Sequence, residues 1–270
     1  MASSIHRILV VAEPSPAGRR RLESAARLAA RQGKPLAALF LENEALLRGA
    51  ALPFTYEIAR TNGQPRPLAP EPLERQFQSQ ARALNRHLAA LATRLAIADW
   101  SFRVARGNLP DAVAAEPGDL VVLGRSAGAV SPLEDRTSPR SGTVMMVPDA
   151  QLAEDQPVVV LISDAGPGGE RTLAMGLELA AEPEASLQIL VPPLPAEERS
   201  RVTAAVDGWL QVRGLAMPVQ VLTGWEGSGL AEILRRLRPQ ALVLSREAPG
   251  LGGDEGRLLA RVDTALVMVS

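Results

Sequence analysis

The stretch Ile8–Phe40, ILVVAEPSPAGRRRLESAARLAARQGKPLAALF, and the stretch Val159–Val191, VVLISDAGPGGERTLAMGLELAAEPEASLQILV, align without a gap at an offset of 151 residues. In each copy an aliphatic run leads into an acidic residue, Glu13 or Asp164, and then into a turn with proline and glycine. The residues that are identical in the two copies are, by their numbers in the first copy, Pro16, Gly18, Arg20, Leu22, Leu28, Ala29, Ala30, Leu36 and Leu39. After the turn, apolar or small residues recur at helical spacing, which predicts a helix laid against a sheet.

The C-terminal parts of the two copies match as well, at an offset near 121. Residues 119–125, DLVVLGR, align with residues 240–246, QALVLSR, and Thr143–Val147 align with Ala265–Val269. The lost positions fall mostly in residues 43–72, a proline-rich segment that we expect to be a long surface excursion. Two offsets joined by one insertion indicate gene duplication, and an internal repeat decides the fold before any other feature. We predict two domains, residues 1–150 and 151–270.

Strand-type and helix-type segments alternate in both copies. The first copy is expected to hold strands at 6–12, 35–41, 100–106, 119–124 and 143–147, with helices at 17–32, 72–97 and 109–116. The second is expected to hold strands at 157–163, 185–191, 218–223, 240–245 and 264–269, with helices at 169–181, 196–213, 228–238 and 254–262. This alternation predicts an α/β protein with two tandem, doubly wound, parallel five-stranded sheets, because parallel crossovers need helices. Ligands of such sheets bind at the carboxyl ends of the strands, where the winding reverses.

Composition excludes several classes of function. Hydrophobic residues make up 46% of the 270, which is globular, and the net charge of −1 argues against nucleic-acid binding. The absence of cysteine excludes thiol catalysis, Cys-ligated zinc and disulfides. The two histidines, His6 and His87, have no second ligand at metal spacing, so no metal site is expected. The apolar runs are strand-length and the first strand begins near residue 6, so we expect no membrane insertion, no signal peptide and a cytoplasmic protein.

Taken in order, these motifs resemble the universal stress protein family, in a tandem form with two fused copies. The resemblance rests on the endings of the first strands (VAEPS at 11–15 and ISD at 162–164), on residues 107–113 (GNLPDAV) and on residues 119–126 (DLVVLGRS). It implies the strand order 3-2-1-4-5, pairing of the two halves through their fifth strands, and a stress-responsive regulator that often binds ATP or AMP.

ATP-binding members of that family share a pattern resembling Gly-x2-Gly-x9-Gly-(Ser/Thr) after the fourth strand, in which glycines let backbone N–H groups approach phosphate. In the first copy Gly124 and Gly128 stand one residue too far apart, and Gly142 follows too late. In the second, Ser245 replaces the first glycine, and Asp263 stands where the last should be after Gly250 and Gly253. Both phosphate motifs are degenerate, so no cofactor is expected, although ATP or AMP stays open. The candidate nucleotide-binding residues are Ala12, Glu13, Gly124, Arg125, Ser126 and Gly128 in the first copy, and Asp164, Gly250 and Gly253 in the second.

Glu13 and Asp164 stand at the position where the resemblance to the family implies an acidic residue that contacts the nucleoside. A carboxylate at this position either accepts a hydrogen bond from a ribose hydroxyl or caps the following helix. The two interpretations are balanced for Glu13, and capping is favoured for Asp164 beside the turn Gly166–Gly169. The run Arg19–Arg21 is interpreted as a solvated first turn of a helix, with an anion or partner site as the alternative.

Three functions follow from these observations. The first is a non-enzymatic stress-response regulator that acts by binding a protein partner or small ligand, with weak or absent nucleotide affinity. The second is an ATP or AMP sensor that uses the pocket of Glu13, Gly124 and Gly128. The third and most distant is a nucleotide hydrolase, for which the sequence displays no base or metal site. Because the halves are expected to pair internally, a monomer and a homodimer both stay open.

Overall fold

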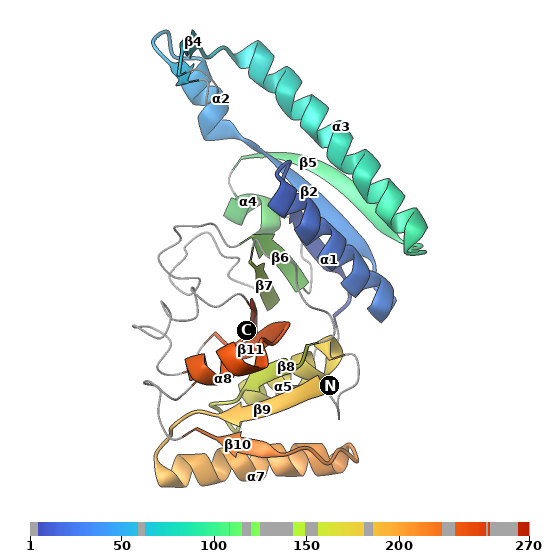
Figure 1. The fold of residues 1–270 in the computed structure, drawn as a ribbon, viewed down its shortest axis with the longest axis vertical. Coiled ribbons are helices and arrows are strands. Elements are labelled where there is room, and N and C mark those ends of the chain that lie inside the picture. The colour runs from blue at the N-terminus through green and yellow to red at the C-terminus, as the bar shows by residue number, and fades with distance from the viewer. Residues whose placement is uncertain are drawn as a thin grey trace.

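The computed structural model describes residues 5–58, 63–107, 109–114, 120–124, 143–148, 156–180, 186–222, 230–246, 248 and 264–269. The main feature is a sheet with the strand order β10-β9-β8-β11-β12-β7-β6-β1-β2-β5. Each half of this sheet has the order 3-2-1-4-5 in its own copy, as the resemblance implied. The α/β fold expected from the sequence is therefore present, and its two five-stranded halves run through the molecule as one sheet (Figure 1).

The strands and helices of the first half lie close to the segments expected from the sequence. Its strands in the main sheet are β1 (Ile8–Ala12), β2 (Leu36–Asn43), β5 (Trp100–Gly107), β6 (Leu120–Gly124) and β7 (Thr143–Val147). Its helices are α1 (Pro16–Gln32), α2 (Glu44–Ala50), α3 (Pro70–Arg94) and α4 (Leu109–Ala114). The surface excursion expected at 43–72 holds structure of its own, namely α2 and a hairpin of β3 (Tyr56–Ile58) and β4 (Pro65–Pro67).

The second half repeats the first without that insertion. Its strands are β8 (Val158–Leu161), β9 (Leu187–Val191), β10 (Val219–Val221), β11 (Ala241–Ser245) and β12 (Ala265–Val269). The helices described in it are α5 (Pro167–Leu179), α7 (Ala196–Val212) and α8 (Leu230–Leu237). The helix expected at 254–262 lies outside the described residues.

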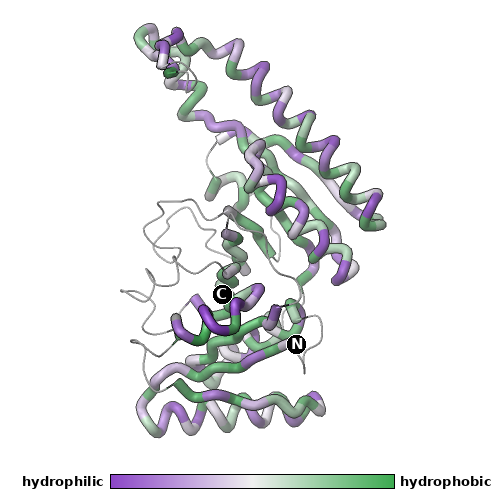
Figure 2. Tube along the Cα trace, in the orientation of Figure 1, coloured by the Kyte–Doolittle hydropathy of each residue, from purple (hydrophilic) through white to green (hydrophobic). Residues whose placement is uncertain are grey.

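Helices cover both faces of the sheet. Buried residues of α1, α3, α5 and α7 share one apolar cluster with one face, and those of α4 and α8 share a second cluster with the other. Aliphatic side chains supply nearly all of this core. The strands of the main sheet are mostly apolar along their length, whereas the helices alternate between apolar and polar residues (Figure 2). Strands covered on two sides need continuous aliphatic runs, which explains why the sequence shows such runs and not alternation.

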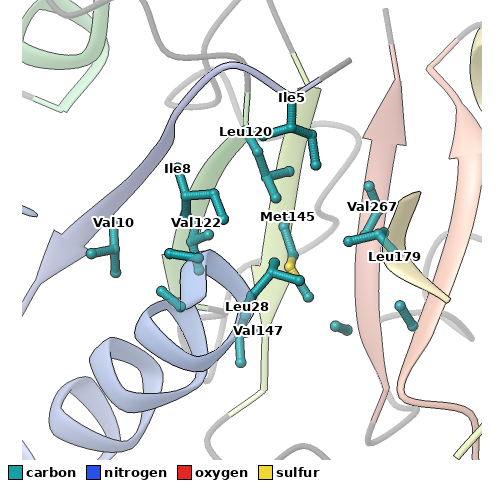
Figure 3. Packing of buried hydrophobic residues seen from close by; sticks show 14 of the residues in the cluster. Ile5, Ile8, Val10, Leu28, Leu120, Val122, Met145, Val147, Leu179 and Val267 are labelled. Atoms are coloured by element: carbon teal, nitrogen blue, oxygen red, sulfur yellow. The ribbon is translucent and has the colours of Figure 1, made fainter. Parts of the chain in front are cut away.

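The two halves meet at their last strands. β7 pairs antiparallel with β12, with Met146 opposite Leu266, Met145 opposite Val267 and Val144 opposite Met268. Each of these strands also pairs in parallel within its own half, β7 with β6 and β12 with β11. At this junction Leu28 of α1, Met145 and Val147 of β7 and Leu179 of α5 line one small, mainly apolar pocket, and Val267 of β12 belongs to the same apolar cluster (Figure 3). The pairing removes one free edge from each half-sheet.

Side chains of α1 complete the junction by capping α5. Gln32 donates from Nε2 to the carbonyl of Glu178 at 2.6 Å, and Arg31 donates from Nη2 to the carbonyl of Leu179 at 2.9 Å. The last carbonyls of a helix lack intrahelical partners, so these bonds satisfy them. The Glu178 carboxylate in turn accepts the backbone N–H of Ile5, with the shorter bond at 3.0 Å. The C-terminal end of α5 is therefore held by the other half.

Candidate functional site: the cleft beside Glu13

A cleft of about 450 Å³ opens at the carboxyl ends of β1, β2 and β5. Its lining from these strands and from the segment after each comprises Val11, Ala12, Glu13, Pro14, Phe40, Leu41, Asn43, Gly107 and Leu109. Its other wall comes from α2, through Glu44, Ala45 and Arg48. Doubly wound sheets bind ligands at strand ends; this cleft begins at β1, beside the point where the winding reverses, and extends toward β2 and β5. Its volume suits a small molecule.

The path from β1 into α1 fixes Glu13 at the rim of this cleft. Ser15 caps α1 by accepting the backbone N–H of Gly18 at 2.9 Å, and proline follows as the first helical residue. Gly18 lies so close to the Glu13 carbonyl that a Cβ there would clash with the backbone. Glycine at this position therefore lets the first turn of the helix pack directly against the end of the strand, and the same contact exists between Gly169 and Asp164.

Arg21 lies beside Glu13 and is buried, with only 3% of its side chain exposed. Its Nη1 donates to Oε1 of Glu13 at 3.0 Å, and Nε has no hydrogen-bond partner among the described residues. The expectation that Arg19–Arg21 is a solvated turn is right for Arg19 and Arg20, which are exposed, and wrong for Arg21. Position 21 falls on the buried stripe of α1, between Gly18 and Ala25, so its side chain points to the sheet.

Gly124, the first glycine of the expected phosphate motif, lies against the Arg21 guanidinium. A Cβ at residue 124 would meet the terminal atoms of this side chain. Glycine at the end of β6 therefore leaves room for the arginine side chain that crosses it. The structure brings Ala12, Glu13 and Gly124 to neighbouring strand ends, whereas Arg125, Ser126 and Gly128 lie outside the described residues.

Asp164, the counterpart of Glu13, has both carboxylate oxygens engaged by the turn that follows it. Oδ1 accepts the N–H of Gly166 at 2.9 Å, and Oδ2 accepts the N–H of Gly169 at 3.1 Å. These bonds satisfy donors at the start of α5, which is the capping role favoured for this residue from the sequence. Glu13 makes no such bond to its own turn and keeps 49% of its side chain exposed. The two acidic residues therefore occupy equivalent places and have different roles.

The remaining second-half candidates are divided between described and undescribed residues. Gly250 and Gly253 lie outside the described residues. Ser245, at the end of β11, approaches Gly168 of the same turn. Arg246 follows it, and its Nε and Nη2 are buried without a partner among the described residues. Burial lowers the pKa of Arg246 from its ordinary value, because the charged guanidinium loses hydration.

A charged cluster lies next to the cleft, at the carboxyl ends of β2 and β5. Arg106, on β5, bonds to Glu42 of β2 at 3.1 Å and to Glu74 of α3 at 3.3 Å. These carboxylates raise the pKa of Arg106, chiefly through the hydrogen bond that its guanidinium donates to Glu42. Sequence reasoning missed this cluster and the α2 wall of the cleft. The available signal was Asn43, whose side chain caps α2 by accepting the N–H of Leu46 at 3.0 Å.

Neither a metal cluster nor a membrane-spanning helix is found in the described part of the chain. They contain no group of three or more histidine and acidic side chains arranged to hold a metal ion. Within the same residues, every helix is too short or too polar to cross a bilayer.

Comparison with known proteins gives matches by structure and none by sequence. No protein-family profile matches the sequence, and no curated protein is significantly similar to it. A universal stress protein from Archaeoglobus fulgidus superposes with a TM-score of 0.70 at 10% identity, covering 98% of this chain and 96% of its own. A putative universal stress protein from Pseudomonas aeruginosa gives 0.53 at 16% identity, covering 98% and 93%. The cytoplasmic domain of a prokaryotic cation chloride cotransporter gives 0.53 at 11% identity, covering 98% and 95%. Over nearly its whole length, the chain therefore has the fold of the universal stress proteins, in the tandem arrangement that its repeat predicts.

Proposed function

We propose that the protein is a non-enzymatic, universal-stress-type regulator that binds a small ligand in the first-half cleft and makes little use of phosphate. The main support is the difference between Glu13 and Asp164. The Glu13 carboxylate gives one oxygen to Arg21 and borders a cleft, whereas both oxygens of Asp164 bond to their own turn. One ligand per chain is expected. We further propose a cytoplasmic location.

The charges around the cleft indicate the class of ligand. Glu13 and Glu44 line it, and Arg48, the one basic residue among its described lining residues, lies 3.8 Å from the Glu44 carboxylate. Each of these carboxylates is paired with a guanidinium, so the described lining offers acceptors to hydroxyl or N–H donors and no unpaired cation to a chain of phosphates. A nucleoside fits this description better than a nucleoside triphosphate.

The second candidate function is an ATP or AMP sensor that uses the same cleft. It is favoured by the position of the cleft at the strand ends of a nucleotide-binding type of fold, and by the nearby cation of Arg21. The degenerate glycine spacing after β6 counts against it.

Calorimetric titration with adenosine, AMP and ATP separates the two candidates. Our proposal expects adenosine to bind at one site per chain, with added phosphates weakening the affinity. Glu13→Gln should weaken adenosine binding by about tenfold, because it replaces a charged acceptor with a neutral one. Asp164→Asn is the matched control and should leave binding unchanged. Tighter binding of ATP than of adenosine would instead establish the sensor, and binding of none of the three would exclude both.

An absence of catalysis is part of the proposal, and it has its own test. Incubation of the protein with ATP and Mg²⁺ should yield no more ADP than incubation of Glu13→Gln under the same conditions. Turnover that disappears in this variant would support a hydrolase and contradict our proposal.

A further inference from the structure

The β3–β4 hairpin stands apart from the main sheet, on an arm built by α2 and the start of α3 (Figure 1). In it Tyr56 lies opposite Pro67, Glu57 opposite Arg66 and Ile58 opposite Pro65. The second copy has no counterpart of this arm in its aligned sequence. A two-stranded hairpin of this length is marginal in water without a further strand or a packed face.

The pleat of the hairpin leaves one edge open. The N–H of Leu68 donates to the carbonyl of Thr55 at 2.9 Å, so Thr55 points its backbone groups toward β4. Backbone direction alternates along a strand, so Tyr56 and Ile58 point theirs away from β4. On the opposite side of the hairpin, the corresponding positions are Pro65 and Pro67, which have no N–H to donate. The outer edge of β3 therefore keeps its donors, and the outer edge of β4 lacks them.

Large apolar side chains accompany this open edge. Tyr56 is 58% exposed, Ile58 is 72% exposed, and nearby Phe54 is 85% exposed. Isolated exposed hydrophobic residues are ordinary, but several within five residues of chain mark an interaction surface. A third strand on β3 would bond the free backbone groups and bury these side chains together.

Charge indicates which strand fits. Glu57 is exposed between the two apolar residues; Arg66 of β4 lies opposite it on one side, and its other side faces the open edge. If a second copy paired antiparallel with Tyr56 opposite Ile58, the two Glu57 carboxylates would face each other, and like charges directly opposite destabilise a sheet. A strand with lysine or arginine at the central position, flanked by apolar residues, would place a cation there instead.

We propose that the outer edge of β3 is a docking site for an extended segment of another protein, with the pattern apolar–basic–apolar, which adds to the hairpin as its third strand. The backbone bonds supply affinity without sequence preference, and the residue opposite Glu57 supplies selectivity. The site lies outside the ligand cleft, so this proposal can be tested independently of the proposed function.

Fluorescence anisotropy with two labelled peptides tests the proposal on the full-length protein. One peptide carries the core Val-Lys-Val-Lys-Val and the other Val-Glu-Val-Glu-Val. The lysine peptide should bind at least about tenfold more tightly, and Glu57→Lys should reverse this order. Glu197→Lys, an exposed change of equal charge on α7, should leave the order unchanged. Equal binding of the two peptides, or no binding at 1 mM, would overturn the proposal.

A second variant isolates the backbone edge. Ile58→Pro removes an outward N–H and leaves the bonds toward β4 in place, because edge positions tolerate proline. It should abolish peptide binding and leave the melting temperature of the protein nearly unchanged. Two other occupants would also overturn the proposal: self-association in sedimentation that Ile58→Pro removes, or Phe54-dependent binding to anionic vesicles without binding to the lysine peptide.

Discussion

Glu13 and Asp164 show how one duplicated position acquires two roles. Both follow the first strand of their copy, and both precede a turn in which a glycine packs on the acidic residue's carbonyl. Asp164 has the shorter side chain, and its carboxylate accepts the backbone N–H groups of Gly166 and Gly169 in the turn that follows it. Glu13 is followed by Ser15, which takes over the capping role, and this leaves Glu13 for Arg21 and the cleft.

The buried side chain of Arg21 makes a testable link between Gly124 and Arg21. Gly124→Ala should lower the free energy of unfolding by about 1–3 kcal/mol, because the new methyl group overpacks the Arg21 guanidinium. In an Arg21→Ala background the same change should cost less than about 0.5 kcal/mol. Urea denaturation of the four proteins in this double-mutant cycle measures the coupling.

Gly18→Ala provides the control for that cycle. Its Cβ would meet the carbonyl of Glu13, which is backbone and does not move aside. Its cost should therefore be the same with Arg21 present or replaced by alanine. If the free-energy costs of Gly124→Ala and Arg21→Ala are additive, then contact with Arg21 is not the reason for glycine at position 124.

The capping role of Asp164 gives a second prediction at the residue scale. Asp164→Ala should lower the free energy of unfolding by about 1–2 kcal/mol, because two N–H groups at the start of α5 lose their acceptor. Asp164→Asn should recover part of this loss through its remaining side-chain oxygen. If both variants unfold like the wild type in urea, then the capping assignment is incorrect.

The sequence predicted most of the main-sheet elements to within a few residues, and it failed where the signals were short. Aliphatic strands and amphipathic helices such as α1 and α3 carry strong periodicity, and the repeat supports each assignment twice. The arm has neither advantage. α2 has seven residues, β3 and β4 have three each, and β4 reads Pro-Arg-Pro, which argues against a strand unless it is at an edge.

The candidate site was predicted in part for the same physical reason. The acidic residues after β1 and β8 and the glycine that ends β6 were predicted, because a doubly wound sheet gathers strand ends. The burial of Arg21 and the contribution of α2 to the cleft depend on how helices pack, which a single sequence does not give. The phosphate-loop residues 125–128 and 250–253 lie outside the described residues, so their assignment remains a prediction.

At the scale of elements, the cap on α5 is a contact between the two halves. Gln32→Ala should lower the free energy of unfolding by about 1 kcal/mol, since the carbonyl of Glu178 loses its donor. Gln211→Ala, on the exposed side of α7, is the matched control and should be neutral within about 0.5 kcal/mol. Thermal unfolding of both variants tests the assignment, and equal melting temperatures would contradict it.

A proline substitution in β7 tests the pairing of β7 with β12. Met146→Pro should lower the free energy of unfolding by more than about 2 kcal/mol and promote aggregation, because it removes a ladder hydrogen bond between two paired neighbours and uncovers sheet edges. Met146→Leu conserves volume and serves as the control. Light scattering during heating compares them, and retained solubility and melting temperature in the proline variant would refute this role of the junction.

For the molecule as a whole, duplication produced one sheet with two unequal halves. Pairing through the last strands leaves β5 and β10 as the outer strands of the main sheet. The first half carries the arm, the cleft and the half-exposed Glu13, whereas the second half carries a capped Asp164. We infer that ligand binding belongs to the first half, and that the second half stabilises the sheet from which the cleft is built.

An experimental structure of the protein purified directly from cells tests this division of roles most directly. We expect density for a small molecule in the cleft, within hydrogen-bond distance of the Glu13 carboxylate, with no phosphate chain over Gly124 and none beside Asp164. A nucleoside triphosphate in either half, or a ligand at Asp164 with the first-half cleft empty, would contradict our account.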